Sequence, residues 1–223
     1  MDYRIISIGT LSRNEFWNEA QATRTPHATT TLVRSGDRVI VVDPGLPAQI
    51  ISARFKERTG LDPSAVTDVF LTNFRPAHRW GLTAFEKARW LISEAEREAI
   101  GRSLVQQHKQ ELNTEVRELI AQDIALLKRC EPAPDRLAPQ VDLFPLPGYS
   151  PGTCGLILSF VNVTVLIAGD AVATSEHLEH GQVQRGCFDA AQAKESLVEA
   201  IEIADVLIPG HDNLLLNPTR RGI

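Results

Sequence analysis

The sequence predicts an α/β (α+β) fold in which two β-sheets pack face to face and helices cover their outer sides. Two observations carry this prediction. Each half of the chain contains short, strand-length apolar runs separated by turn residues, and each half then continues into a helical segment. With 223 residues, of which 43% are hydrophobic, the chain can bury one sizeable core. We therefore expect a single domain over residues 1–223.

The first half of the chain alternates strands and turns. Its clearest strand, RVIVV at residues 38–42, is almost wholly β-branched, which is typical of a buried strand. The motif DPG at residues 43–45 ends this strand sharply, because proline fixes φ and glycine allows a positive φ. Residues 47–59 suit a helix. The other strands expected in this half cover residues 4–8, 29–33, 66–72 and 89–92.

A long helical segment is expected at about residues 93–130. Ser93 suits its N-cap, because Glu96 follows three residues later. Apolar or neutral positions recur every four residues, at Ile100, Leu104, His108, Leu112, Val116, Ile120 and Ile124. Such a face usually packs on a core, either as one helix or as a helix broken near Gly101 or Asn113. The alternative is that the segment forms a lid or mediates a homodimer.

The second half repeats the strand and helix pattern. Strands are expected near residues 141–145, 155–160, 163–168 and 206–208, and a helix at 188–204. Residues 171–187 carry no apolar periodicity and are expected to form a loop.

Composition limits the partners and the location of the protein. A net charge of −5 without a basic stripe disfavours nucleic acid. Three widely spaced cysteines predict neither a disulfide framework nor a zinc ribbon. The N-terminus lacks the apolar run of a signal peptide, and no run reaches membrane-spanning length. We therefore expect a cytoplasmic protein with a small-molecule substrate and no membrane partner.

Five short motifs follow expected strands in a fixed order. They are DPG at residues 43–45, TNFRPAHRWG at 72–81, PGYSPG at 147–152, AGD at 168–170 and PGH at 209–211. Each alone is weak, because proline–glycine pairs mark turns in any protein. In this order they resemble the metallo-β-lactamase superfamily, and the resemblance covers nearly the whole chain. It implies a four-layer αββα sandwich of two mixed β-sheets flanked by helices, with the 93–130 segment as a long insert.

Most ligands of the first metal site of that family are replaced. The family loop corresponding to residues 72–81 reads T-H-x-H-x-D-H-x-G, and the first site would use the positions of Asn73, Arg75 and Tyr149. Asparagine and tyrosine oxygens are weak zinc ligands and arginine is permanently cationic, so we expect no metal ion there. These three residues become catalytic candidates instead. Tyr149 and Asn73 could donate hydrogen bonds to a substrate oxygen, and Arg75 could supply positive charge.

The second metal site of the family is better retained. It corresponds to Ala77, His78, Asp170 and His211, so three of four ligands remain. Two imidazoles and one carboxylate suit one zinc ion with a position left for water, or iron or manganese in its place. The resemblance thus implies at most one metal ion, which would activate water to hydrolyse a small ester, lactone, thioester or phosphoester.

Two other interpretations stay open on the sequence. In one, the chain is an inactive relative that binds a ligand or acts as a scaffold, with the Arg75 guanidinium replacing the first-site cation and pairing with Asp170. In the other, the two histidines and the carboxylate hold iron for oxygen chemistry. The fold alone does not separate these functions, because one fold serves many chemistries.

The remaining histidines and one cysteine near the motifs have simpler interpretations. His27 is expected in a solvent-facing turn, and His177 and His180 on an exposed polar loop. Cys154 is expected as a buried thiol. Asp43 has two interpretations: it supports the metal loop through hydrogen bonds, as the resemblance implies, or it merely shapes the turn before Pro44.

Overall fold

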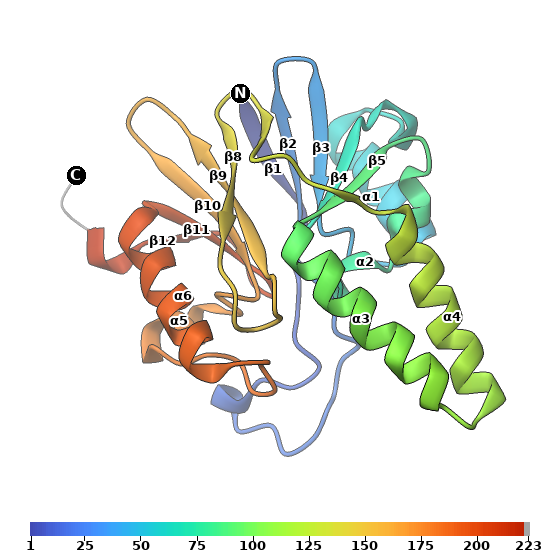
Figure 1. Cartoon of the computed structure of the whole chain (residues 1–223). Helices are drawn as coiled ribbons and strands as arrows, with labels where there is room; N and C mark the ends of the chain where they lie inside the picture. The colour runs from blue at the N-terminus through green and yellow to red at the C-terminus, as the bar shows by residue number, and fades with distance from the viewer. Residues whose placement is uncertain (221–223) are drawn as a thin grey trace.

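Two six-stranded sheets lie face to face, with helices on both outer sides, in the computed structural model, which describes residues 1–220 (Figure 1). The first sheet has the order β1-β2-β3-β4-β5-β6, and the second has the order β12-β11-β10-β9-β8-β7. Both are mixed: β3 to β6 pair in parallel in the first, and β10 pairs with β11 in parallel in the second. The predicted four-layer αββα sandwich is confirmed.

The strands of the first sheet are β1 (Asp2–Ser7), β2 (Thr30–Ser35), β3 (Arg38–Val42), β4 (Asp68–Leu71), β5 (Arg89–Ile92) and β6 (Glu131–Pro132). Those of the second are β7 (Arg136–Ala138), β8 (Val141–Pro145), β9 (Cys154–Ser159), β10 (Thr164–Gly169), β11 (Val206–Pro209) and β12 (Leu215–Leu216). Every expected strand is present. The strands that the sequence did not predict, β6, β7 and β12, are too short to leave a periodic pattern.

The α-helices are α1 (Ala48–Thr59), α2 (Pro76–Arg79), α3 (Glu94–Gln110), α4 (Thr114–Arg129), α5 (Ser175–His180) and α6 (Ala190–Ile203). A 3-10 helix, η1 (Glu15–Trp17), lies in the long segment between β1 and β2. Within residues 1–220, no helix is long and apolar enough to cross a membrane.

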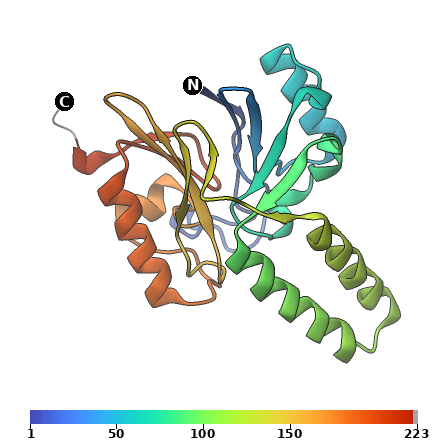
Figure 2. The ribbon, with the colours of Figure 1, turned by 45° about the horizontal axis from the view of Figure 1, so that its top comes forward.

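The core lies between the two sheets and extends outward beneath the helices. Ile40, Val42 and Phe70 of the first sheet belong to one buried cluster with Leu156 of the second. Val41 points the opposite way, as alternation along a strand requires, and joins the cluster beneath α1. Figure 2 shows α1 and α6 on opposite outer sides of the paired sheets. This rigid framework places the carboxyl ends of several strands at one edge.

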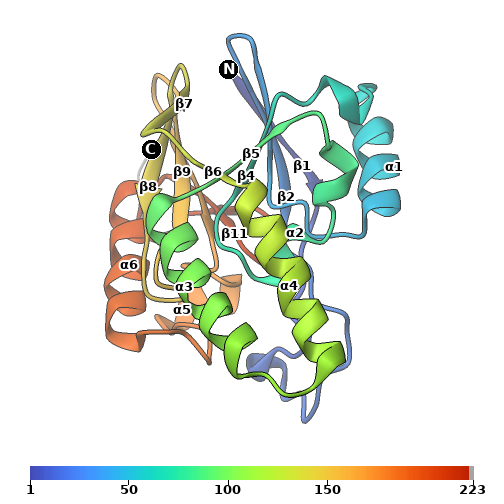
Figure 3. The same cartoon turned by 45° about the vertical axis from the view of Figure 1, so that its right-hand side comes forward.

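The insert predicted at residues 93–130 is a pair of antiparallel helices, α3 and α4 (Figure 3). The chain turns at residues 111–113, where the Asn113 side chain accepts hydrogen bonds from the first backbone N–H groups of α4. Of the two breaks that the sequence offered, the one near Asn113 is present and the one near Gly101 is not, and the apolar stripe does not continue across the turn. Ile100 packs against the core, whereas Leu112 at the turn is 95% exposed. That the hairpin mediates a homodimer stays a prediction.

The segment expected as a loop at residues 171–187 contains helix α5. His177 is only 2% exposed, so its expected place on an exposed loop is wrong, whereas His180 is exposed. Both rings contact Phe16 of η1, with ring centroids 4.9 Å apart for His177 and 4.6 Å for His180. The cover over this helix comes from the other end of the chain, which no local pattern could reveal.

Two of the three free cysteines are buried, Cys130 and Cys154, and Cys187 is partly exposed. Burial raises the pKa of the Cys130 thiol to about 11 and that of the Cys154 thiol to about 12. Both thiols therefore stay protonated near neutral pH, and neither offers a thiolate. The expectation of a buried thiol at Cys154 is confirmed.

Candidate metal centre

The three side chains predicted as metal ligands come from the carboxyl ends of neighbouring strands. Asp170 follows β10 and His211 follows β11, and these strands pair in parallel with Gly169 opposite Pro209. Their following residues therefore meet at the same edge of the sheet. His78 arrives from the other sheet on α2, the short helix after β4.

The ligand atoms of His78, Asp170 and His211 all lie within 4.8 Å of one another, and all three residues are buried. His78 Nε2 is 2.8 Å from Asp170 Oδ2, and His211 Nε2 is 3.0 Å from Asp170 Oδ1. Gly210 is required beside them, because a Cβ there would come within 2.5 Å of Asp170 Oδ1. The structure thus brings together residues that are far apart in the sequence; that they bind a metal stays a prediction.

Hydrogen bonds on the far side of each ring fix which nitrogen faces the cluster. His211 Nδ1 lies 3.1 Å from the carbonyl oxygen of Thr10 and 3.0 Å from that of His27. Carbonyl oxygens only accept, so His211 Nδ1 carries a proton. His78 Nδ1 lies 3.0 Å from Asp43 Oδ2. An ionised carboxylate also only accepts, so His78 Nδ1 carries a proton as well. Both Nε2 atoms are left to face Asp170, which is the arrangement that metal-binding histidines require.

Asp43 therefore does more than shape a turn. Its carboxylate accepts hydrogen bonds from the Thr72 backbone N–H at 2.8 Å and the Thr72 hydroxyl at 2.7 Å, in addition to its contact with His78. The residue adopts a φ of 49°, in the left-handed region that is costly for a side chain other than glycine. Of the two interpretations from the sequence, support of the metal loop is the one that these contacts favour.

The charges of the cluster favour a protonated, positively charged His78 and an ionised, negatively charged Asp170. Burial alone would lower the pKa of His78, but the carboxylates of Asp170 and Asp43 outweigh it and raise this pKa to about 10. Burial would raise the pKa of Asp170, but the charges of His78 and His211 hold it well below its usual range. A proton on His78 Nε2 and a divalent ion are thus alternative partners for the Asp170 carboxylate.

An unpaired oxygen of Asp170 is a further sign that these side chains suit a cation. Asp170 Oδ1 is buried and has no hydrogen-bond partner among residues 1–220, although His211 Nε2 is 3.0 Å away. That contact lacks hydrogen-bond geometry, so Oδ1 has no donor among the described residues. A buried carboxylate oxygen without a donor is unfavourable unless a cation lies beside it.

We predict that zinc binds more tightly as the pH rises. Zinc must displace the proton from His78 Nε2, whose pKa is about 10, so raising the pH removes its competitor. Between pH 6 and 7.5 the apparent Kd should fall about tenfold per pH unit. Titration calorimetry in buffers of different ionisation enthalpy should count about one proton released at pH 7. An affinity independent of pH, with no proton released, would contradict the competition.

Asn73 lies against the cluster rather than in open space. Its amide nitrogen donates to Asp170 Oδ2 at 3.0 Å, and its amide oxygen accepts from the Arg75 backbone N–H at 2.9 Å. The residue thereby fixes both the carboxylate and the loop that carries His78. That Asn73 donates a hydrogen bond to a substrate oxygen stays a prediction.

The guanidinium of Arg75 lies away from the carboxylate that the sequence offered as its partner. It donates to the carbonyl oxygen of Gly186 at 3.1 Å, and its carbon atom lies 4.5 Å from the centre of the Tyr149 ring. Within the described part of the chain, the side chains that contact the Asp170 carboxylate are those of Asn73, His78 and His211. The expected Arg75–Asp170 pair is therefore replaced by a cation–π contact with Tyr149, because Arg75 precedes α2 and extends outward.

Tyr149 is a neutral hydrogen-bond donor near the cluster. It is 6% exposed, and burial together with the Asp170 charge raises its pKa above the ordinary value, against the opposing effect of Arg75. The phenol therefore keeps its proton at any physiological pH. Its hydroxyl forms no hydrogen bond with another side chain of residues 1–220 and can donate to a ligand.

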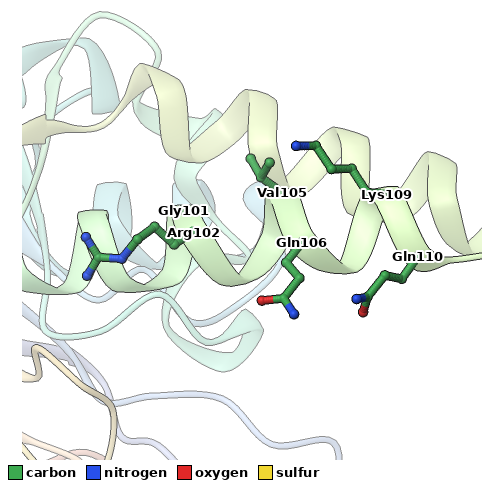
Figure 4. A pocket seen from close by; sticks show the side chains of 6 residues that line it. All are labelled: Gly101, Arg102, Val105, Gln106, Lys109 and Gln110. Carbon is green, nitrogen blue, oxygen red and sulfur yellow. The ribbon is translucent and has the colours of Figure 1, made fainter.

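A groove of about 900 Å³ opens beside Tyr149, between the loop that carries His78 and the α3–α4 hairpin. Its walls include Phe74, Arg75, Ile100, Leu104, Tyr149 and Phe188. A separate hollow of about 490 Å³ lies on α3, and all of its lining residues belong to that helix, from Gly101 to Gln110 (Figure 4). The groove, unlike the hollow, is lined by Arg75 and Tyr149, whereas His78, Asp170 and His211 are not among its lining residues.

Glu96 is a residue of the site that sequence reasoning missed. It is fully buried, and its carboxylate accepts from the Phe74 N–H at 3.0 Å, the Gly152 N–H at 2.9 Å and the Ser150 hydroxyl at 2.7 Å. It thus joins the start of α3 to the two loops that carry His78 and Tyr149. The sequence showed Glu96 only as the third residue after the cap Ser93, and that cap is confirmed.

Comparisons with known proteins agree with this architecture. A structure from Thermotoga maritima, provisionally described as a metallo-beta-lactamase, has 21% identity and a TM-score of 0.70, covering 96% of this chain and 98% of that one. The dizinc quorum-quenching lactonase AidC, solved with a homoserine product, has 16% identity and a TM-score of 0.67, covering 85% and 74%. A point mutant of AiiA from B. thuringiensis, with N-decanoyl-L-homoserine bound at its active site, has 18% identity and a TM-score of 0.61, covering 90% and 86%. At these identities the likeness shows the fold alone.

No curated protein sequence matches the chain. A family model for the metallo-beta-lactamase superfamily, however, matches residues 24–211, which is most of the chain and spans all five sequence motifs. The chain therefore belongs to the metallo-beta-lactamase superfamily.

Proposed function

We propose that this protein is a metal-dependent hydrolase that holds one divalent ion through His78, Asp170 and His211 and cleaves an ester or lactone bond. The observation that carries the proposal is the convergence of two Nε2 atoms on one buried carboxylate, with both rings oriented by acceptors behind them. Zinc suits this donor set, and a bound ion would supply Lewis acidity and lower the pKa of water toward neutrality.

One ion rather than two is proposed, because the first-site positions have other partners. Asn73 is engaged with Asp170, and Arg75 covers the ring of Tyr149. A permanently charged guanidinium beside that position disfavours a second cation by like-charge repulsion.

The chain's own residues have distinct tasks in this proposal. The neutral Tyr149 hydroxyl donates a hydrogen bond to the substrate carbonyl oxygen as negative charge develops on it. Arg75 fixes the Tyr149 ring through their stacked contact. Asn73 holds the Asp170 carboxylate, and Asp43 holds His78 in the orientation that leaves Nε2 toward the cluster.

The groove supports a substrate with an apolar chain. Phe74, Ile100, Leu104 and Phe188 line it, and apolar walls of this kind bind apolar groups by removing them from water. Two proteins with this fold, AidC and AiiA, are described with acyl homoserine products or ligands bound. We therefore propose acyl esters and acyl lactones as the substrate class.

The experiment compares Tyr149→Phe with the unaltered protein on a panel of esters and lactones of increasing acyl length, with and without zinc. We expect zinc-dependent hydrolysis that improves with chain length, and a loss of about a hundredfold in kcat/KM in the variant. Zinc content should not change. The other tyrosine of the chain provides the matched control, because Tyr3→Phe should leave the rate unaltered. Hydrolysis that persists without any metal, or an unaffected Tyr149→Phe variant, would exclude this assignment of roles.

A second candidate function rests on the position of His78 between Asp43 and Asp170. A protonated His78 could itself neutralise the two carboxylates, at 3.0 Å and 2.8 Å, and so replace the metal. The protein would then be a ligand-binding relative without catalysis. Zinc binding separates this candidate from the hydrolase.

A further inference from the structure

A second cavity, of about 210 Å³, lies between the N-terminal segment and the region of α5. We call it the η1–α5 cavity. Its lining residues are Leu11, Arg13, Glu15, His177, Gln184 and Arg185. None of them lines the groove beside Tyr149, so the cavity is distinct from the groove.

The hydrogen bonds of His177 determine where its ring carries a proton. The Thr174 hydroxyl lies 2.7 Å from Glu176 Oε2 and 2.9 Å from His177 Nδ1. A hydroxyl has one proton, and an ionised carboxylate can only accept, so Thr174 donates to Glu176. Thr174 then accepts from His177 Nδ1–H. A neutral His177 is left with a lone pair on Nε2.

Two features support this protonation state. Burial opposes ionisation of Glu176, but hydrogen bonds outweigh it, led by the one from Thr174, and keep its pKa below the ordinary value. Burial lowers the pKa of His177, so its ring is neutral near pH 7. Phe16 packs edge-on against the same ring and keeps it in place.

Gln184 lines the same cavity, but its Oε1 atom is buried and has no hydrogen-bond partner among the described residues. An oxygen that water cannot reach is covered by protein atoms and is not open to a ligand in the cavity. His177 Nε2 is therefore the acceptor on which the binding of a donor depends.

The charged residues of the wall add a preference for an anion. Arg185 is paired with Glu15 at 2.6 Å, whereas Arg13 forms no ion pair within 4.0 Å among residues 1–220 and acts on Glu19 only at longer range. Arg13 can therefore bind a carboxylate. Leu11 supplies an apolar surface for the carbon chain of the ligand.

We propose that the η1–α5 cavity binds a small hydroxy-carboxylate, whose hydroxyl donates to His177 Nε2 and whose carboxylate pairs with Arg13. The site goes beyond the proposed hydrolase, because it uses none of the candidate metal ligands. It would bind its ligand whether or not a metal is present.

The test measures binding of 4-hydroxybutyrate and butyrate, which differ by the hydroxyl, by calorimetry or ligand-observed NMR. We expect 4-hydroxybutyrate to bind at least about tenfold more tightly than butyrate. His177→Phe should remove this difference, while the matched variant His180→Phe, next to the same Phe16 but outside the cavity wall, should retain it. Arg13→Gln should weaken both ligands. Equal binding of the two ligands, or an unchanged preference in His177→Phe, would overturn the proposal.

Two further measurements guard against a variant that fails to fold. Nitrogen-15 NMR of the unaltered protein should show His177 Nε2 without a proton, and a protonated Nε2 would overturn the proposal directly. Thr174→Val should weaken 4-hydroxybutyrate binding, because Nδ1–H loses its acceptor. Repeating the binding after treatment with a chelator separates this site from the hydrolase: binding that persists without metal supports the cavity even if no hydrolysis is ever found.

Discussion

Asp170→Asn is expected to abolish both zinc binding and hydrolysis. Among residues 1–220, Asp170 is the group that both Nε2 atoms contact, and an amide is a poor zinc ligand with no charge to attract the ion. We expect less than about a tenth of an equivalent of bound zinc and a loss of about a thousandfold or more in kcat/KM, or about 4 kcal/mol of transition-state stabilisation. Zinc content by mass spectrometry and steady-state kinetics are the measurements.

The matched control for this variant is Asp123→Asn. Asp123 of α4 forms an ion pair with Arg79 of α2 at 2.7 Å, but contacts none of the three candidate ligands. The Asp123→Asn protein should bind a full equivalent of zinc. Asp170→Asn should remain folded, because asparagine has nearly the same shape as aspartate and the Asp43 carboxylate still lies 3.0 Å from the His78 ring. A folded Asp170→Asn protein that retains zinc would show that the ligands have been misassigned.

Glu96→Ala is expected to cause the largest loss of stability among single changes near the site. It would leave the Phe74 N–H, the Gly152 N–H and the Ser150 hydroxyl without their buried acceptor. The free energy of unfolding should fall by about 3–5 kcal/mol, as measured by urea denaturation. In Glu96→Gln the free energy of unfolding should fall by less, because the glutamine side chain keeps one acceptor oxygen.

An exposed glutamate on the same helix gives the comparison. Glu98 forms only a surface pair with Arg102, so Glu98→Ala should change stability by less than about 0.5 kcal/mol. Equal losses for the Glu96 and Glu98 variants would mean that the buried contacts do not hold the loops. A stable Glu96→Ala protein would contradict the role given to this residue.

The fold could be predicted from the sequence where local pattern and tertiary structure agree. The β-branched run at residues 38–42 became β3 with the predicted bounds, and the DPG motif ended it. The periodicity of residues 93–130 correctly indicated helix. The sequence left breaks near Gly101 and near Asn113 both open, because one capping residue changes the direction of the chain without changing the repeat of apolar residues.

The sequence motifs predicted the candidate metal ligands but not the arrangement of the side chains around them. The family pattern selected His78, Asp170 and His211, and parallel strands bring two of them to one edge. The pattern could not show where long side chains go. Arg75 bends over Tyr149 instead of reaching Asp170, and that choice depends on the carbonyl oxygen of Gly186, which comes from a distant segment.

Residues whose partners lie far away in the sequence were the ones missed. In the sequence Glu96 is only the third residue after the cap Ser93, whereas in the structure it holds two loops. His177 was expected to be exposed because its cover, Phe16, belongs to the N-terminal segment. In both cases the local sequence is polar, while burial is decided by a contact that no short window contains.

The most direct test of the whole account is the zinc content of the protein after incubation with excess zinc and removal of the unbound ion. Convergence of two oriented imidazoles on the Asp170 carboxylate predicts about one equivalent of zinc per chain, lost in His211→Ala. Less than about a tenth of an equivalent in the unaltered protein would contradict it.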